Sequence, residues 1–182
     1  MTVVSDSTPL ICLSAVADLH LLRDLFGTVT IPDAVFHEVV TAGMGRPGSR
    51  EVETAAGVWI RVEERLPTAA TARIMEQQKL QLGEAQAIEL GLALKAELLL
   101  LDEQRAVAFA RSAGLTIMRT GTVYAAAKRS GLIDSVGGRL EAARGGVLAA
   151  RARLSSDPQG LWRVLTLKGG GSAGSVLGKT WP

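Results

Sequence analysis

The sequence predicts an α/β fold in which a mostly parallel central sheet carries helices on both faces. Short apolar segments alternate with longer segments of helical periodicity from residue 2 to residue 131, and this alternation is typical of parallel sheets. The clearest strand lies in Glu97–Glu103, where four consecutive leucines precede two acids. An apolar run this short, between two helical segments, indicates a strand buried on both faces.

Composition excludes several classes of protein. A chain of 182 residues with 47% hydrophobic and 4% aromatic residues is long enough for one domain with a sizeable core, and it is neither disordered nor a coiled coil. The net charge of +2 gives no overall basic field, so nucleic-acid contacts would come from a local patch.

Cysteine and histidine usage sets further limits. The single cysteine, Cys12, excludes an internal disulfide, and with only His20 and His37 a Cys/His zinc site is excluded too. No apolar stretch approaches the roughly 20 residues of a membrane helix. We therefore expect a soluble, cytoplasmic protein.

The first predicted strand covers Thr2–Ser5 and ends at Asp6. Ser7 or Thr8 can cap the following helix, and Pro9 suits its first turn because a missing N–H costs nothing there. This segment predicts a carboxylate at the carboxyl end of a strand.

That helical region continues to Gly27, with Asp18 as an internal break or second cap. A strand over residues 28–31 follows, and Pro32 begins another helix. Glu38 falls on the apolar stripe of that helix, and a carboxylate on such a stripe needs a partner.

The middle of the chain predicts a Gly/Pro loop at 42–49, a helix at 51–56, a strand at 59–62, a helix at 68–78 and a stronger helix from Gly83. Glu84 then lies in the first turn of that stronger helix, on its buried side.

The remaining predicted elements are the Leu98 strand, a helix at 104–113, a strand at 115–118 and a helix to residue 130 that Thr120 or Thr122 caps. Beyond Gly145 we expect a helix at 147–154, an apolar segment at 161–167 and a disordered Gly/Ser-rich end at 168–182. The domain is thus expected over residues 1–145, with a partly disordered extension over 146–182.

Four acids form the candidate site. Asp6 and Asp102 follow strands, and Glu38 and Glu84 face inward from helices. Because like charges at close range disfavour one another, such a cluster favours a hard divalent cation, Mg²⁺ or Mn²⁺. Phosphodiester hydrolysis is the chemistry that suits a metal held by carboxylates.

Three of the four acids also have a simpler interpretation, whereas Glu38 is harder to dismiss because it lies on the apolar stripe. Asp6 and Asp102 can be helix caps, and Glu84 can favour the positive end of its helix. We prefer a functional site because four carboxylates gathered at one place usually mark one.

Basic side chains that could line an RNA path are Arg105, Arg111, Arg119, Lys128 and Arg129. The alternative for any one of them is a solvated helix face. Because aromatic residues are sparse, a broad base-stacking platform is not expected.

The sequence resembles the PIN-domain family in four motifs of matching order and spacing. They are Asp6–Ile11, Ile31–Val35 with Glu38-Val39, Gly83–Ala85 with Ala87-Ile88, and Leu100–Glu103 to Ala106. Lys128–Ile133 adds a similarity to VapC-like proteins. The resemblance implies a three-layer α/β/α sandwich and Mg²⁺- or Mn²⁺-dependent ribonuclease activity. It also implies the toxin role in a toxin–antitoxin pair, with a small antitoxin protein as partner and a homodimer as the usual state.

The resemblance also implies roles for individual residues. Asp6, Glu38, Glu84 and Asp102 would be the metal-site acids, Thr8 would support metal-bound water, and Glu103 would be an accessory acid. Many relatives have Asp where Glu103 stands, and the segment after Gly145 is longer here than in relatives.

Our hypothesis is a metal-dependent endoribonuclease that leaves a 5′-phosphate and a 3′-hydroxyl. One alternative is a non-catalytic PIN-like module that binds RNA or protein. Another is a phosphoacceptor receiver domain, although Ser5 and Ser7 flank Asp6 where that fold wants paired acids.

Overall fold

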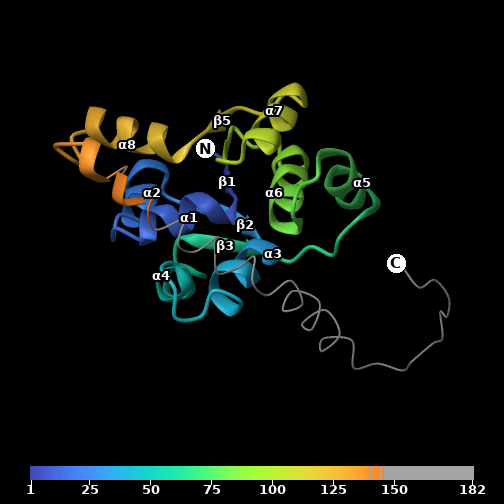
Figure 1. Ribbon diagram of the computed structural model, residues 1–182, viewed down its shortest axis with the longest axis horizontal. Helices are drawn as coiled ribbons and strands as arrows, with labels where there is room; N and C mark the ends of the chain where they lie inside the picture. The colour runs from blue at the N-terminus through green and yellow to red at the C-terminus, as the bar shows by residue number, and fades with distance from the viewer. Residues whose placement is uncertain (140, 144, 146–182) are drawn as a thin grey trace.

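The protein is a five-stranded parallel sheet with helices on both faces, as a computed structural model shows (Figure 1). The structure describes residues 1–139, 141–143 and 145. The strand order is β3-β2-β1-β4-β5, and all four pairings are parallel. The predicted α/β/α architecture is confirmed.

The strands are β1 Val3–Ser5, β2 Val29–Pro32, β3 Ile60–Glu63, β4 Leu98–Leu100 and β5 Ile117–Met118. The helices are α1 Ser7–Ser14, α2 His20–Phe26, α3 Asp33–Phe36, the π-helix η1 His37–Thr41, α4 Ser49–Ala55, α5 Ala69–Gln78, α6 Leu82–Ala93, α7 Gln104–Ser112 and α8 Thr120–Arg129. Apart from the π-helix, these elements are of the types that the sequence predicts.

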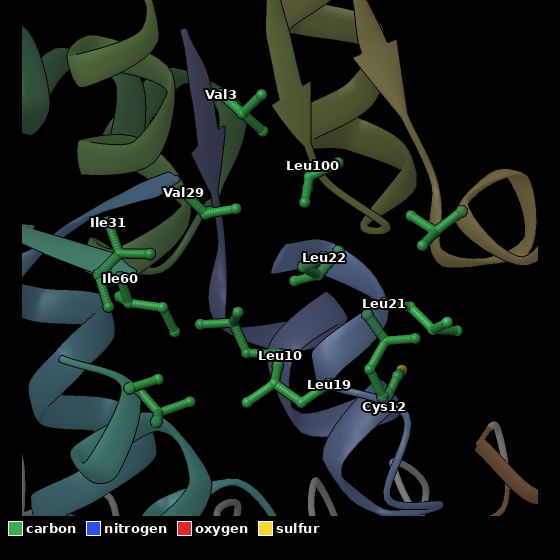
Figure 2. Close-up of a cluster of buried hydrophobic side chains, with 14 of the residues drawn as sticks. Val3, Leu10, Cys12, Leu19, Leu21, Leu22, Val29, Ile31, Ile60 and Leu100 are labelled. Atoms are coloured by element: carbon green, nitrogen blue, oxygen red, sulfur yellow. The ribbon is translucent and has the colours of Figure 1, made fainter. Parts of the chain in front are cut away.

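The four leucines of the β4 segment build both cores. Leu98 and Leu100 join a cluster with residues of α1, α2 and α8, whereas Leu99 and Leu101 join a cluster with α5, α6 and α7. Successive side chains of a strand point to opposite faces, so one short strand serves two layers. Figure 2 shows the first cluster, and Figure 1 shows the two groups of helices on either side of the sheet.

The break predicted at Asp18 is confirmed, but Asp18 does not act as a cap through its side chain. Its buried carboxylate pairs with Arg139, whose hydrogen bond and charge interaction with Asp18 hold the pKa of the guanidinium above its usual range. Tyr124 of α8 is fully buried nearby. Burial first, and the charge of Asp18 second, raise the pKa of the Tyr124 phenol.

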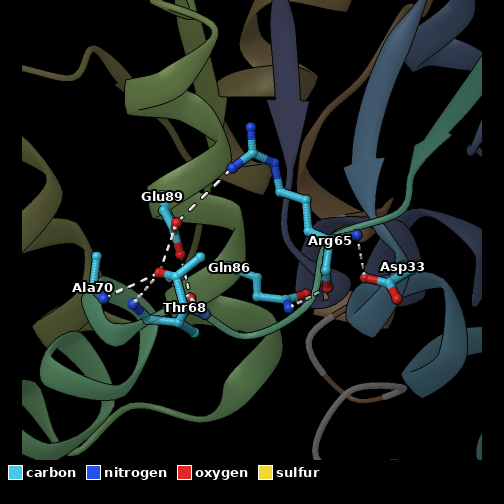
Figure 3. Close-up of polar contacts among 7 residues, drawn as sticks. Asp33, Arg65, Thr68, Ala70, Gln86 and Glu89 are labelled. Atoms are coloured by element: carbon cyan, nitrogen blue, oxygen red, sulfur yellow. Dashed lines mark hydrogen bonds and ion pairs between the residues drawn. The ribbon is translucent and has the colours of Figure 1, made fainter. Parts of the chain in front are cut away.

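Polar contacts hold the connection from β3 to α5 against α6 (Figure 3). Glu89 of α6 accepts hydrogen bonds from the hydroxyls of Thr68, at 2.9 Å, and Thr71. Gln86 of the same helix donates to the backbone oxygen of Arg65 at 2.9 Å, and the Arg65 amide donates to Asp33 at 3.3 Å. The connection is thereby joined to both α6 and α3.

The strand order excludes the receiver-domain alternative. Receiver-like sheets have the order 2-1-3-4-5, whereas here β2 lies between β3 and β1.

The remaining sequence predictions concern membrane-spanning helices and the segment after residue 146. Within the part of the chain that the structure describes, no helix combines the length and apolarity needed to cross a membrane. The predictions for 147–154, 161–167 and 168–182 lie outside the described residues.

Candidate functional site

The candidate site lies where the sheet reverses its direction of winding. β1 is central, with β2 on one side and β4 on the other. Open α/β sheets bind ligands at the carboxyl ends of strands at such a point. Asp6 immediately follows β1, and its backbone N–H donates to the oxygen of Leu100 at 3.0 Å. Asp102 follows Leu100 by two residues, so both acids belong to the same edge of the sheet.

Asp6 is fully buried and is itself the cap of α1. Its Oδ2 accepts the backbone N–H of Thr8 at 3.4 Å, which replaces the predicted cap at Ser7 or Thr8. The Ser7 hydroxyl lies 3.4 Å from Oδ1 of Asp6 and 3.1 Å from Oε1 of Glu38. The structure therefore brings Asp6 and Glu38 together across Ser7, although their chain positions are 32 residues apart.

Glu38 lies in a π-helical turn rather than in the predicted α-helix. The amide of Ala42 donates to the oxygen of His37 at 2.9 Å, an i to i+5 hydrogen bond. Gly43 permits a tight approach after this turn, since a Cβ there would lie 2.1 Å from the oxygen of Val39. π-turns occur frequently at functional sites, and this one carries a candidate acid.

The start of α6 contacts the same pair of acids. A Cβ at Gly83 would lie 2.9 Å from Oε2 of Glu38 and 3.7 Å from Oδ1 of Asp6. Glu84 is buried in the first turn, as predicted, and its Oε2 accepts the backbone N–H of Gln81 at 3.0 Å.

The two acids after β4 have different partners. Glu103 caps α7, because its carboxylate accepts the N–H of Ala106 at 2.7 Å. The alternative that Asp102 caps this helix is therefore wrong. Asp102 instead accepts two hydrogen bonds from Thr120, at 3.0 Å from its N–H and 2.5 Å from its hydroxyl. Asp102 thus holds the start of α8, where Thr120 or Thr122 was the predicted cap.

The chemistry of this donor set fits a hard divalent cation. Asp6 and Glu38 present carboxylate oxygens with the Ser7 hydroxyl between them, and the backbone N–H of Thr8 donates to Asp6. Oxygen ligands are those that Mg²⁺ and Mn²⁺ prefer. Among the described residues, no three or more acidic, histidine or cysteine side chains are gathered closely enough to hold a metal ion. The structure shows Asp6 and Glu38 together across Ser7, and the other predicted acids, Glu84, Glu103 and Asp102, each accept a backbone N–H at the start of a helix.

The predicted RNA-binding cations are all exposed, but at different places. Arg105 is in the first turn of α7, next to the end of β4. Lys128 and Arg129 are in the last turn of α8, about 12 Å along the helix axis from Thr120. Arg119 directly follows β5 and precedes Thr120, the partner of Asp102, so Arg105 and Arg119 lie at the sheet edge that carries the acids.

Sequence reasoning missed the part that Ser7, Gly83 and Thr120 have in this arrangement. Ser7 and Thr120 were candidates for helix caps, and Gly83 marked the start of a helix. No local pattern reveals that a hydroxyl or a missing side chain faces an acid from another element, because those contacts depend on tertiary packing.

Comparison with known proteins identifies the family of this chain. A family model described as a PIN domain matches residues 2–148. No curated protein sequence matches the chain. PIN domains are generally nucleases, and the match covers most of the chain. The protein therefore belongs to the PIN-domain family.

Proposed function

We propose that this protein is a metal-dependent endoribonuclease that hydrolyses RNA phosphodiester bonds. The observation that carries the proposal is the pairing of Asp6 and Glu38 across the Ser7 hydroxyl at the carboxyl end of β1. Two buried or half-buried carboxylates held side by side repel each other, and a divalent cation relieves that repulsion.

The acids proposed to hold Mg²⁺ or Mn²⁺ are Asp6, Glu38, Glu84 and Asp102, with Glu103 as an accessory acid. Thr8 would support the water shell of the metal. When bound, the cation supplies an activated water and stabilises the leaving oxygen. The protein contributes the fixed positions of its acids, since Asp6 is held by the start of α1 and Asp102 by the start of α8.

We further propose that the nuclease is the cytoplasmic toxin of a toxin–antitoxin pair. Its partners would be an RNA substrate, a small antitoxin protein and a second copy of the chain in a homodimer. The support is the similarity of the sequence motifs to VapC-like proteins. The exposed Arg105, in the first turn of the helix that follows Asp102 and Glu103, would give one contact for RNA phosphate.

A second candidate is a PIN-like module that binds RNA or protein without cleaving it. This alternative is favoured by one observation, that four of the acids already have a structural role as acceptors of backbone N–H groups at helix starts.

The decisive experiment compares cleavage of structured and single-stranded RNAs by wild type, Asp6→Asn and Asp102→Asn, with Mg²⁺ or Mn²⁺. Asparagine caps a helix as well as aspartate does, so Asp6→Asn keeps the cap while it removes the charge. We expect a loss of activity on the order of 100-fold or more, since ligand-supporting contacts alone are worth up to about 100-fold.

Asp24→Asn is the matched control, because Asp24 forms only a surface pair with Arg23. Full activity in both folded site variants would contradict the assignment. A wild type that cleaves no RNA and binds no Mn²⁺ in calorimetry would favour the binding module.

A further inference from the structure

Each carboxylate oxygen of Glu38 lies against a different residue, Ser7 or Gly83. Oε1 lies 3.1 Å from the Ser7 hydroxyl. Oε2 fills the space where a side chain at position 83 would begin, 2.9 Å from an ideal Cβ. One residue attracts the carboxylate and the other leaves room for it.

The Ser7 hydroxyl stands between two acceptors. The Ser7 residue is only 4% exposed, and its hydroxyl lies 3.4 Å from Asp6 and 3.1 Å from Glu38. A hydroxyl carries one proton, so it donates to one carboxylate at a time and keeps both within its reach. Hydrogen bonds to charged acceptors are stronger than neutral ones, particularly where water is excluded. Ser7 therefore links the start of α1 to η1 at the acids themselves.

The backbone conformation at position 83 does not require glycine. The φ of Gly83 is outside the left-handed region, in contrast to Gly27, Gly48 and other turn glycines. It lies inside α6, where alanine is the better helix former. What glycine provides is space, because a Cβ would approach Oε2 of Glu38 to 2.9 Å and Val35 to 3.4 Å. With Val35 also close, the added methyl group would displace the Glu38 carboxylate.

We propose that Ser7 and Gly83 are positioning residues that hold the Glu38 carboxylate against Asp6. Ser7 fixes one oxygen and Gly83 admits the other. The consequence for cation binding rests on the proposed function, whereas the contacts of Ser7 and Gly83 with Glu38 can be tested without it.

Two pairs of variants isolate these effects. Ser7→Ala is matched by Ser5→Ala, because Ser5 is also buried but its hydroxyl donates to the backbone oxygen of Asp6, at 2.8 Å, and not to a carboxylate. Gly83→Ala is matched by Gly91→Ala in the same helix, where a Cβ would meet only Leu115 at 3.4 Å and more distant atoms. Each control makes the same chemical change away from Glu38.

The first measurement is Mn²⁺ affinity by calorimetry, together with RNA cleavage. We expect Ser7→Ala and Gly83→Ala to weaken Mn²⁺ binding by roughly 10- to 100-fold, as loss of ligand-orienting contacts does. Ser5→Ala and Gly91→Ala should bind as wild type does. Unchanged affinity in both Ser7→Ala and Gly83→Ala would overturn the proposal.

The second measurement does not depend on nuclease activity. Melting temperatures are compared for each variant alone and combined with Glu38→Ala, in a double-mutant cycle. Ser7→Ala should lower the melting temperature less in the Glu38→Ala background than in wild type, because the hydroxyl has already lost that acceptor. Gly83→Ala should be more favourable to the melting temperature in the Glu38→Ala background than in wild type, because the carboxylate that the new methyl group would displace is gone. Additive effects in both cycles would overturn the positioning role. If wild type binds no Mn²⁺ and cleaves no RNA, the proposed function fails, and the cycles still decide whether Ser7 and Gly83 position Glu38.

Discussion

Four of the five candidate acids accept a backbone N–H at the start of a helix. They are Asp6 at α1, Glu84 at α6, Glu103 at α7 and Asp102 at α8. Negative charge is stabilised near the N-terminus of a helix by the exposed N–H groups and the aligned peptide dipoles. Capping and cation binding are therefore compatible roles here, because capping occupies part of each carboxylate and orients the remainder.

At this scale, Thr120→Val should destabilise the protein through Asp102. Valine keeps the shape of the buried threonine but removes the hydroxyl that donates to Asp102 at 2.5 Å. We expect a loss of about 1–2 kcal/mol in the free energy of unfolding, measured in urea. The control is Thr122→Val on the same helix, where the side chain is exposed and the change should be near zero. Equal effects of the two substitutions would contradict the role of Thr120.

The positions of these acids could be predicted from the sequence, but their partners could not. The apolar run before Asp102 and the β-branched run before Asp6 indicate strand ends. Whether Asp102 or Glu103 caps α7 depends on the backbone conformation at Glu103 and on the nearby Thr120, which no pattern in Leu98–Glu103 encodes. The pair between Asp18 and Arg139 joins residues 121 positions apart and has no local signal.

At the scale of elements, the π-turn η1 and helix α6 decide where Glu38 lies. A helical stripe correctly predicts that Val35 and Val39 are buried, and Glu38 has the partner that a carboxylate on this stripe requires. The periodicity cannot show the extra residue in the turn, since apolar residues four apart fit an α-helix equally well. The site therefore depends on how the start of α6 packs against η1, which only the tertiary structure shows.

Hydrogen bonds to Glu89 join helix α6 to the β3–α5 connection. We therefore expect Glu89→Ala to destabilise this connection. The substitution leaves the hydroxyl of buried Thr71 without its acceptor and removes the 2.9 Å contact to Thr68 (Figure 3). The expected cost is about 1–3 kcal/mol in the free energy of unfolding, with faster hydrogen exchange in α5.

Glu76→Ala is the matched control, because Glu76 is an exposed residue of α5. Its effect should stay within about 0.5 kcal/mol. Unchanged exchange in α5 of Glu89→Ala would show that the hydrogen bonds at Glu89 do not hold the connection.

At the scale of the whole molecule, the alternation of short strands and helices was sufficient to predict the fold. Each residue of β4 belongs to one of two cores, so the run Leu98–Leu101 specifies a central strand with helices on both sides. The packing of α8 against α1 and α2 was not predictable in the same way. It buries Tyr124 close to Asp18, with Cys12 and Arg139 as the other charged or titratable groups acting on the phenol.

This burial predicts a specific loss of stability at alkaline pH. The pKa of Tyr124 is raised above its usual value near 10, chiefly by burial and then by Asp18, so above pH 10 the unfolded chain releases a proton that the folded protein retains. The ionisation of Tyr124 should thus add no pH dependence to the free energy of unfolding below pH 10. Above pH 10 it should fall by about 1.4 kcal/mol per pH unit, until the phenol also ionises in the folded state.

Tyr124 is the only tyrosine in the sequence, so tyrosinate absorbance at alkaline pH reports on this one group. We expect the absorbance to appear together with unfolding, as followed by circular dichroism, rather than before it. Tyr124→Phe removes the titrating group and keeps the ring in the core, so its free energy of unfolding should decline less steeply above pH 10. Two results would contradict this prediction. One is a tyrosinate signal near pH 10 in the folded protein, and the other is the same decline of the free energy of unfolding above pH 10 in wild type and Tyr124→Phe. Either would show that the packing of α8 does not shield the Tyr124 phenol from water.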